Sequence, residues 1–80
     1  MMKLYKKYID VVVLVNQKGD IKPLFIVFNG TKYRVDRIFS MRNAASSLGG
    51  AGLMFECLIQ NHKRKIFLER DKWFIESYQP

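Results

Sequence analysis

The apolar residues of this chain fall in short runs that glycine, asparagine and other turn-forming residues separate. Runs of four to eight residues, rich in β-branched and aromatic side chains and bounded by turns, are typical of β-strands. The pattern therefore predicts six strands, at residues 8–15, 24–28, 32–39, 53–60, 64–69 and 72–77. Pro23 stands directly before the second of these, a position at the start of a strand that proline tolerates.

The connection between the second and third predicted strands is the pair Asn29-Gly30. Both central residues of a type I′ turn need a positive φ, which asparagine and glycine adopt readily. The sequence therefore predicts an antiparallel hairpin here. Polar turns are also expected at residues 16–20, 61–63 and 70–71.

The segment from Ser40 to Gly52 has a different character. Ser40 could cap a short helix over residues 41–48, with Gly49 as its left-handed end. A flexible glycine-rich loop is the alternative, and the sequence leaves both open. The glycines at 49, 50 and 52 lead into a strand and lack the Lys-Ser or Lys-Thr of a phosphate loop, which favours a tight connection or a bulge.

Apolar side chains occupy both faces of several predicted strands. In the first strand, Val11 and Val13 alternate with Val12 and Leu14, so neither face is polar. A sheet with one solvated face would show polar residues there. The sheet should therefore close on itself, be covered by residues 41–48, or bury a face against another chain. We expect an all-β fold (or β with one short helix): one small domain over residues 1–80, a mostly antiparallel, partly closed barrel of five to six strands.

The composition supports a globular domain. Of 80 residues, 49% are hydrophobic and 14% aromatic, enough for a core. The single cysteine excludes an intramolecular disulfide. The apolar run after Lys3, Lys6 and Lys7 is too short for an export signal or a membrane span, so we expect a cytoplasmic protein.

Few residues suggest catalysis. Cys57 lies in an apolar strand, where a buried, inert thiol is expected. His62 is expected in a surface turn, and one cysteine with one histidine cannot supply a typical zinc site. The carboxylates are scattered along the chain. We therefore expect no enzyme, no cofactor and no metal.

The charge gives the remaining functional signal. Fourteen Lys and Arg against seven Asp and Glu give a net charge of +7 and a pI near 9.8. Such a balance favours a polyanionic partner, although it also fits simple solubility. Grooves for single-stranded nucleic acid combine cations with aromatic platforms. The candidate nucleic-acid-binding residues are Lys32, Arg34, Arg42, Lys63, Arg64, Lys65, Lys72 and Phe74. Trp73 is more simply a core residue.

The alternative is a protein-interaction or homodimeric assembly subunit that uses an apolar sheet face. Several strings look familiar together: Tyr8-Ile9-Asp10-Val11, the turn from Gly19 to Pro23, Gly30 to Arg37, the loop from Ala45 to Gly50, and Trp73-Phe74-Ile75-Glu76. On these, the chain resembles a group of short bacterial proteins of unknown function. The resemblance implies a stand-alone cytoplasmic domain and brings no activity, cofactor or site residue.

Overall fold

The computed structural model describes residues 3–46, 49 and 51–78, which form a single antiparallel sheet of seven strands. The fold is all-β, as predicted, with seven strands rather than five to six, and the described residues contain no helix. The strands are β1 (Tyr5–Val15), β2 (Ile21–Phe28), β3 (Thr31–Arg34), β4 (Arg37–Ala45), β5 (Ala51–Ile59), β6 (His62–Glu69) and β7 (Lys72–Ser77).

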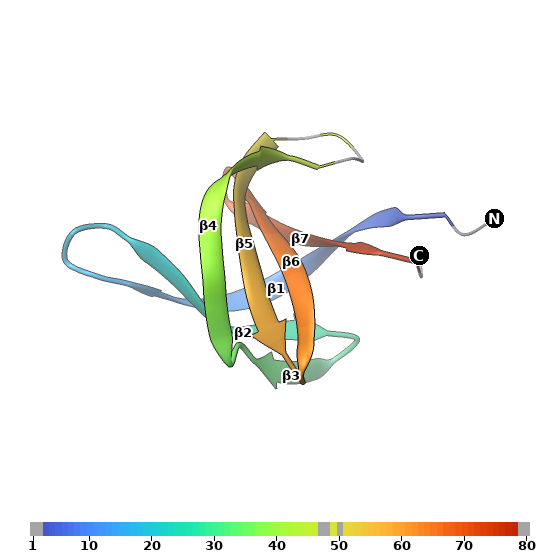
Figure 1. Ribbon diagram of the computed structural model, residues 1–80, viewed down its shortest axis with the longest axis horizontal. Helices are drawn as coiled ribbons and strands as arrows, with labels where there is room; N and C mark the ends of the chain where they lie inside the picture. Colours follow the sequence, from blue (N-terminus) through green and yellow to red (C-terminus); the bar gives the residue numbers. More distant parts are fainter. Residues whose placement is uncertain (1–2, 47–48, 50, 79–80) are drawn as a thin grey trace.

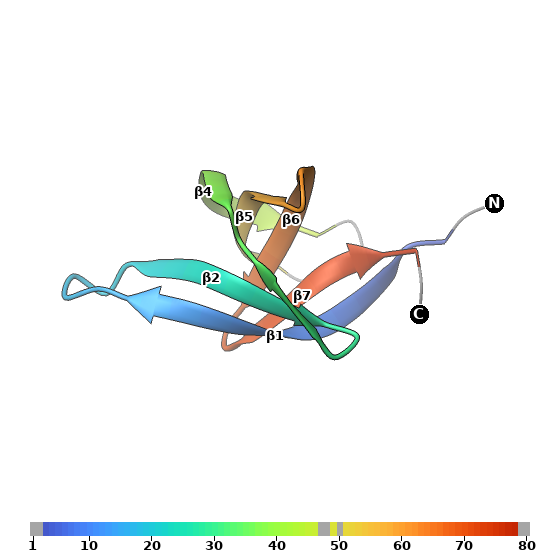
Figure 2. The ribbon, with the colours of Figure 1, turned by 90° about the horizontal axis from the view of Figure 1, so that it is seen from below.

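The strand order β3-β2-β1-β7-β6-β5-β4 places the first strand inside the sheet, between β2 and β7. Its first half, Tyr5 to Ile9, pairs with β7, and its second half, Asp10 to Val15, pairs with β2. The sheet curls so strongly that β4, β5 and β6 cross over β1 and β2 (Figures 1 and 2). The amide of Asp36 donates to the carbonyl of Leu58 at 2.9 Å, which ties the β3–β4 connection to β5. The result is a half-barrel that stays open.

The predicted hairpin at Asn29-Gly30 is confirmed. The φ angles are 51° and 77°, and β2 and β3 pair from Phe28 and Thr31 onward. The β5–β6 turn is also formed by two residues with positive φ, Gln60 and Asn61, so the expectation of a turn over 61–63 is one residue late.

Pro23 lies inside β2 rather than before it. It pairs with Val13 next to an irregularity of register between Val12 and Val13, and bulges are sites where a strand tolerates proline. On its other side, β2 pairs with β3 only from Phe25 onward. Among the described residues, no neighbouring strand on that side would therefore accept a hydrogen bond from an amide at position 23.

Two of the predicted elements are wrong. The expected helix or loop over residues 41–48 is strand β4 as far as Ala45, and residues 47 and 48 lie outside the described residues. Its alternation suits the outermost strand, where Met41 pairs with Phe55 and Asn43 with Leu53. The single strand expected at 32–39 is two strands, because the chain passes from one edge of the sheet to the other at Val35 and Asp36.

The apolar residues on both faces are explained by two separate clusters. The inner, concave face buries Ile26, Phe55, Cys57, Ile59 and Ile66, with Trp73 packed against them. The opposite face buries a second cluster of Met54, Phe67 and Phe74, against which Ala44 packs.

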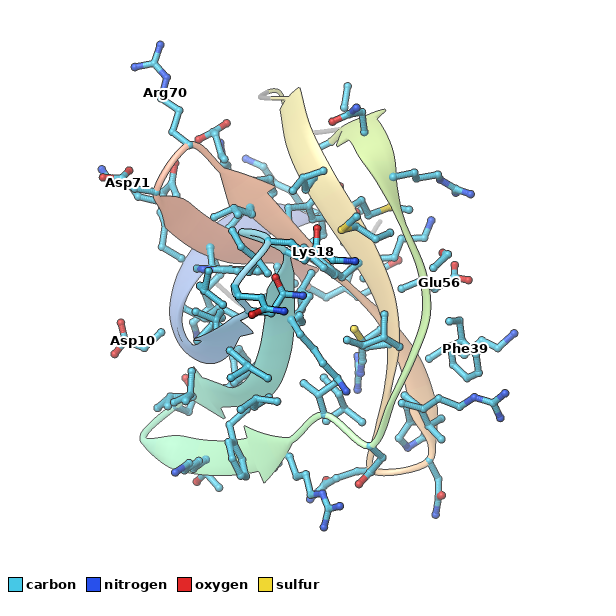
Figure 3. All side chains as sticks on the ribbon, turned by 90° about the vertical axis from the view of Figure 1, so that its left-hand side faces the viewer. Asp10, Lys18, Phe39, Glu56, Arg70 and Asp71 are labelled. Atoms are coloured by element: carbon cyan, nitrogen blue, oxygen red, sulfur yellow. The ribbon has the colours of Figure 1, made fainter. Side chains whose placement is uncertain are left out.

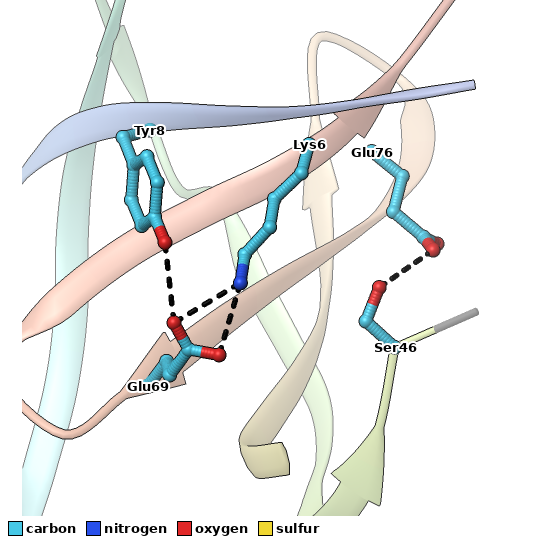
Figure 4. Close-up of polar contacts among 5 residues, drawn as sticks. All are labelled: Lys6, Tyr8, Ser46, Glu69 and Glu76. Atoms are coloured by element: carbon cyan, nitrogen blue, oxygen red, sulfur yellow. Dashed lines mark hydrogen bonds and ion pairs between the residues drawn. The ribbon is translucent and has the colours of Figure 1, made fainter. Parts of the chain in front are cut away.

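The end of β4 lies over this second cluster. There, Ser46 is buried and its hydroxyl donates to Glu76 Oε2 at 2.9 Å (Figure 4). Residues 44–46 thus cover one face as a strand and its extension, where the sequence suggested a helix or a loop.

The β1–β2 hairpin extends beyond the rest of the sheet (Figure 1). Residues 13–15 and 21–23 pair only with each other among the described residues, and we call this two-stranded projection the arm. Its turn is closed by Asn16 Oδ1, which accepts from the amides of Lys18 and Asp20 at 2.9 Å each. Val12, Leu14 and Val15 are exposed on the arm and at its base.

Candidate functional site

Three of the predicted binding residues share one surface. Arg42 pairs with Met54, Lys63 with Leu58 and Lys65 with Glu56, and these partners alternate along β5 with the inner-face residues Phe55 and Cys57. Because successive side chains of a strand point to opposite faces, Arg42, Lys63 and Lys65 project from the outer face of β4, β5 and β6.

Two further residues, which the sequence argument did not select, complete this surface. Phe39 is 40% exposed on β4, and the Arg37 guanidinium carbon and the Lys63 ammonium each lie 5.3 Å from the centre of its ring. Figure 3 shows Phe39 and Glu56 projecting from the same side of the sheet, away from Asp10. We call Arg37, Phe39, Arg42, Lys63 and Lys65 the basic face.

The basic face is not neutralised from within. Its four cations face one carboxylate on the same part of the sheet, that of Glu56, a local balance of +3 (four minus one). Within residues 3–46, 49 and 51–78, the ion pairs are Lys6–Glu69 and Arg34–Asp36, and neither involves the basic face. The surface is therefore positive and open to an anion.

The other predicted binding residues lie elsewhere. Lys32 and Arg34 are on β3, at the opposite end of the strand order, where the Lys32 ammonium stands 4.3 Å above the ring of Phe25. Lys72 lies near Tyr8, 5.7 Å from its ring centre. Arg64 pairs with Cys57 and so belongs to the inner face.

Phe74 offers no ring to a ligand. It is 1% exposed, stacks on Phe67 with ring centres 4.8 Å apart, and is covered by the Lys6 ammonium at 4.4 Å. In the sequence, Phe74 stands two residues after Lys72, and side chains two residues apart on a strand lie on the same face. That face holds the second apolar cluster, in which Phe74 is buried.

Arg37 and Phe39 share a face by simple alternation, but Arg42 cannot be placed on the same face as these two from alternation alone. The register of β4 against β5 shifts between Ile38 and Ser40, so Phe39 sits in a bulge. A bulge adds one residue to a strand and reverses the face expected for the residues that follow. The sequence signal that remains is an aromatic residue two positions after an arginine on a polar strand.

A cleft opens between β6 and β7. These strands pair only over Phe67–Glu69 and Lys72–Phe74, and beyond that they separate. The cavity between them has a volume of about 490 Å³. One wall is the basic run 62–65. The remainder is lined by three aromatic residues, Phe28, Tyr33 and Tyr78, by aliphatic side chains, and by the polar residues Gln60, Glu76 and Ser77.

A polar cluster on the outer face joins β1 to β6. The Lys6 ammonium donates to both carboxylate oxygens of Glu69, at 3.0 and 2.9 Å, and the Tyr8 hydroxyl donates to Oε1 at 3.2 Å (Figure 4). The hydrogen bond from Lys6 holds the pKa of Glu69 below its ordinary value, and the same bond raises the pKa of Lys6. All three groups are satisfied by one another, so the cluster is structural.

No group that the structure describes is arranged for metal or thiol chemistry. Within the described ranges, no three His, Cys, Asp or Glu side chains converge as a metal site requires. Burial raises the pKa of the Cys57 thiol to about 11, and the side chain is fully buried. The described residues also include no helix long and apolar enough to cross a membrane.

Comparisons with protein-family models, with curated proteins and with solved structures find no match. The resemblance to short bacterial proteins therefore stays a prediction. Function has to be inferred from the side chains, because a fold alone does not specify one.

Proposed function

We propose that this protein binds single-stranded nucleic acid through the basic face. The observation that carries the proposal is Phe39, an exposed ring on an outermost strand with a cation from β4 and a cation from β6 beside it. Proteins that bind single strands combine cations that follow the phosphates with aromatic rings on which bases stack. The basic face offers both within one curved surface.

The geometry favours single strands over a duplex. β4 is one of the two edge strands of the sheet, and Phe39 and Arg37 project from it beside Lys63, which reaches across β5. A ring at this position can meet the flat face of an unpaired base, whereas the bases of a duplex are stacked on each other. A phosphate near Lys63 would attract the Lys63 ammonium away from the Phe39 ring. One face of that ring would then be open to a base.

The test is fluorescence anisotropy with labelled single-stranded oligonucleotides, DNA and RNA, over a range of salt concentrations. We expect Phe39→Ala to weaken binding by about 1–3 kcal/mol, the typical contribution of one stacked base. We expect Lys63→Gln to reduce the slope of log K against log salt by about 0.7, the value for one phosphate contact on a single strand.

The matched control is Lys18→Gln, which removes the same charge at the tip of the arm (Figure 3). This variant should bind like the parent. Equal losses for Lys18→Gln and Lys63→Gln would mean that net charge alone drives binding, and the proposed interface would be wrong. Unchanged binding by Phe39→Ala would remove the stacking role.

A second function, self-association, is favoured by the arm. Leu14 and Val15 are 52% and 56% exposed although both are large apolar residues on a strand. Residues 13–23, the arm and its turn, carry two lysines and one aspartate, a net charge of +1 (two minus one) in a chain of +7. The arm therefore meets little like-charge repulsion when it approaches a second copy.

Self-association is tested by gel filtration and sedimentation at micromolar concentration. If the arm mediates a dimer, Leu14→Ser should convert it to a monomer, and the basic-face variant Lys63→Gln should leave it intact. A parent protein that is monomeric at all accessible concentrations would exclude this second function.

A further inference from the structure

We propose that the cleft between β6 and β7 is a separate binding site for a nucleotide, a phosphate joined to a flat aromatic base. The cleft lies on the inner side of the half-barrel. The inference concerns mostly different residues from the basic face, and Lys63 and Lys65 are the two residues that contribute to both surfaces.

The phosphate half of the ligand is indicated by the wall of the cleft. Residues 62–65 are His-Lys-Arg-Lys, and all four are exposed. Arg64 is at the centre of this run, on the same face as the core residues Cys57 and Ile66. Neither ion pair of the described chain uses it, so its guanidinium is available for the two-pronged contact that arginine makes with phosphate.

The base half is indicated by the aromatic residues that line the same space. Tyr33 lies on the inner face against the core, Phe28 carries the Lys7 ammonium 4.5 Å from its ring centre, and Tyr78 is exposed at the opening. Three aromatic side chains around one cavity suit a flat π-system better than an alkyl chain. The volume of about 490 Å³ is within the range of about 300–1,000 Å³ for small-molecule sites.

The charge of the cleft fits the same ligand. The lining holds three cations, Lys63, Arg64 and Lys65, of which Arg64 projects from the inner face, and a single carboxylate, that of Glu76. A neutral nucleoside would fill the aromatic part and leave the cations unused, and inorganic phosphate would do the reverse. Only a ligand with both parts uses the whole site.

The experiment is a titration of the isotopically labelled full chain, followed by two-dimensional NMR, with AMP, adenosine and inorganic phosphate as separate probes. AMP should give saturable shifts at the amides of residues 59–66 and 75–78. Adenosine and phosphate should each bind at least about tenfold more weakly, the difference expected when one charge-assisted contact is lost.

The variant Arg64→Gln should weaken AMP binding about tenfold for the same reason. Its matched control is Arg70→Gln, on the turn at the other end of β6, where the side chain points away from the body (Figure 3). Thermal unfolding of both variants checks that the fold is retained. Equal AMP affinities for the two variants, or decanoate binding more tightly than AMP, would overturn the inference.

Titrations with oligonucleotides that carry or lack a 5′-phosphate separate the two proposals. They also show whether the ligand of the cleft is a free nucleotide or the phosphorylated end of a strand. If an oligonucleotide moves the amides of the basic face while AMP leaves the cleft unmoved, the cleft site is wrong and the proposed function stands. If AMP enters the cleft but no oligonucleotide binds, the proposed function is wrong and the cleft site stands. A stronger response to the phosphorylated oligonucleotide than to AMP would assign the cleft to strand ends.

Discussion

Replacing Phe74 and Phe39 by alanine, one at a time, compares two phenylalanines that differ in burial. Phe74 is 1% exposed and stacks on Phe67, whereas Phe39 is 40% exposed at the edge of the sheet. A buried phenylalanine replaced by alanine costs about 3–5 kcal/mol. Exposed substitutions usually cost within about 0.5 kcal/mol, and the cation–π contacts of Phe39 add about 0.5–1 kcal/mol.

These costs are large for so small a protein. At about 0.05–0.15 kcal/mol per residue, 80 residues give a free energy of unfolding of about 4–12 kcal/mol. Phe74→Ala should therefore remove a large part of the stability, and Phe39→Ala little of it. Because Phe74→Ala could leave too little folded protein to measure, Phe74→Leu serves as a milder variant, with an expected cost of about 1–2 kcal/mol.

The assay is urea unfolding followed by circular dichroism, with the free energy extrapolated to water. The expected order of stability is parent, Phe39→Ala, Phe74→Leu and Phe74→Ala. If Phe74→Ala costs no more than Phe39→Ala, the second apolar cluster is not packed as described. The explanation of why both faces of the sheet are apolar would then be wrong.

Three further predictions concern single residues. Gly52→Ala should destabilise by about 1–3 kcal/mol in urea unfolding, because a Cβ at this position would collide with the carbonyl oxygen of Leu68; an unchanged midpoint would contradict this. The stabilisation from Glu69 is present above its ordinary pKa of 4.5 and is lost as pH falls through its lower folded value. The melting temperatures of the parent and of Glu69→Gln should therefore converge in acid, and a pH-independent difference would refute the Lys6 contact as the cause. With a pKa of about 11 rather than 9.0, Cys57 holds about a hundredfold less thiolate at pH 8, so a thiol reagent should react rapidly only after unfolding; rapid labelling of the native protein would show that the strand opens.

The strands were predictable where the signal is local. The Asn29-Gly30 turn and the last strand, Lys72–Ser77, follow from turn chemistry and alternation within a few residues. Residues 41–45 were not predictable in this way. A short stretch of Met, Arg, Asn and Ala favours a helix by intrinsic propensity, and its strand conformation is imposed by pairing with β5.

The candidate surface was predictable in part for a similar reason. Alternation is sufficient to set Arg42, Lys63 and Lys65 on one face once their strands are aligned. The alignment itself is a long-range property that single residues do not encode, and the bulge at Phe39 breaks the simple alternation that would connect Arg37 and Phe39 to Arg42. Proximity in sequence predicts that Phe74 and Arg64 join this surface, but neighbours in sequence are not always neighbours in space: Phe74 is buried, and Arg64 lies on the inner face.

The division of β1 between two partners has a consequence for folding. Its second half can pair with β2 as soon as that hairpin forms. Tyr5, in its first half, pairs with Ser77, which lies 72 residues later in the sequence (77 minus 5). Contacts between residues that are far apart in the sequence form slowly, because the chain loses conformational entropy before the contact stabilises it. During synthesis the residues around Tyr5 therefore stay without their partner strand until β7 has emerged, and a refolding experiment should show native structure around Tyr5 appearing late.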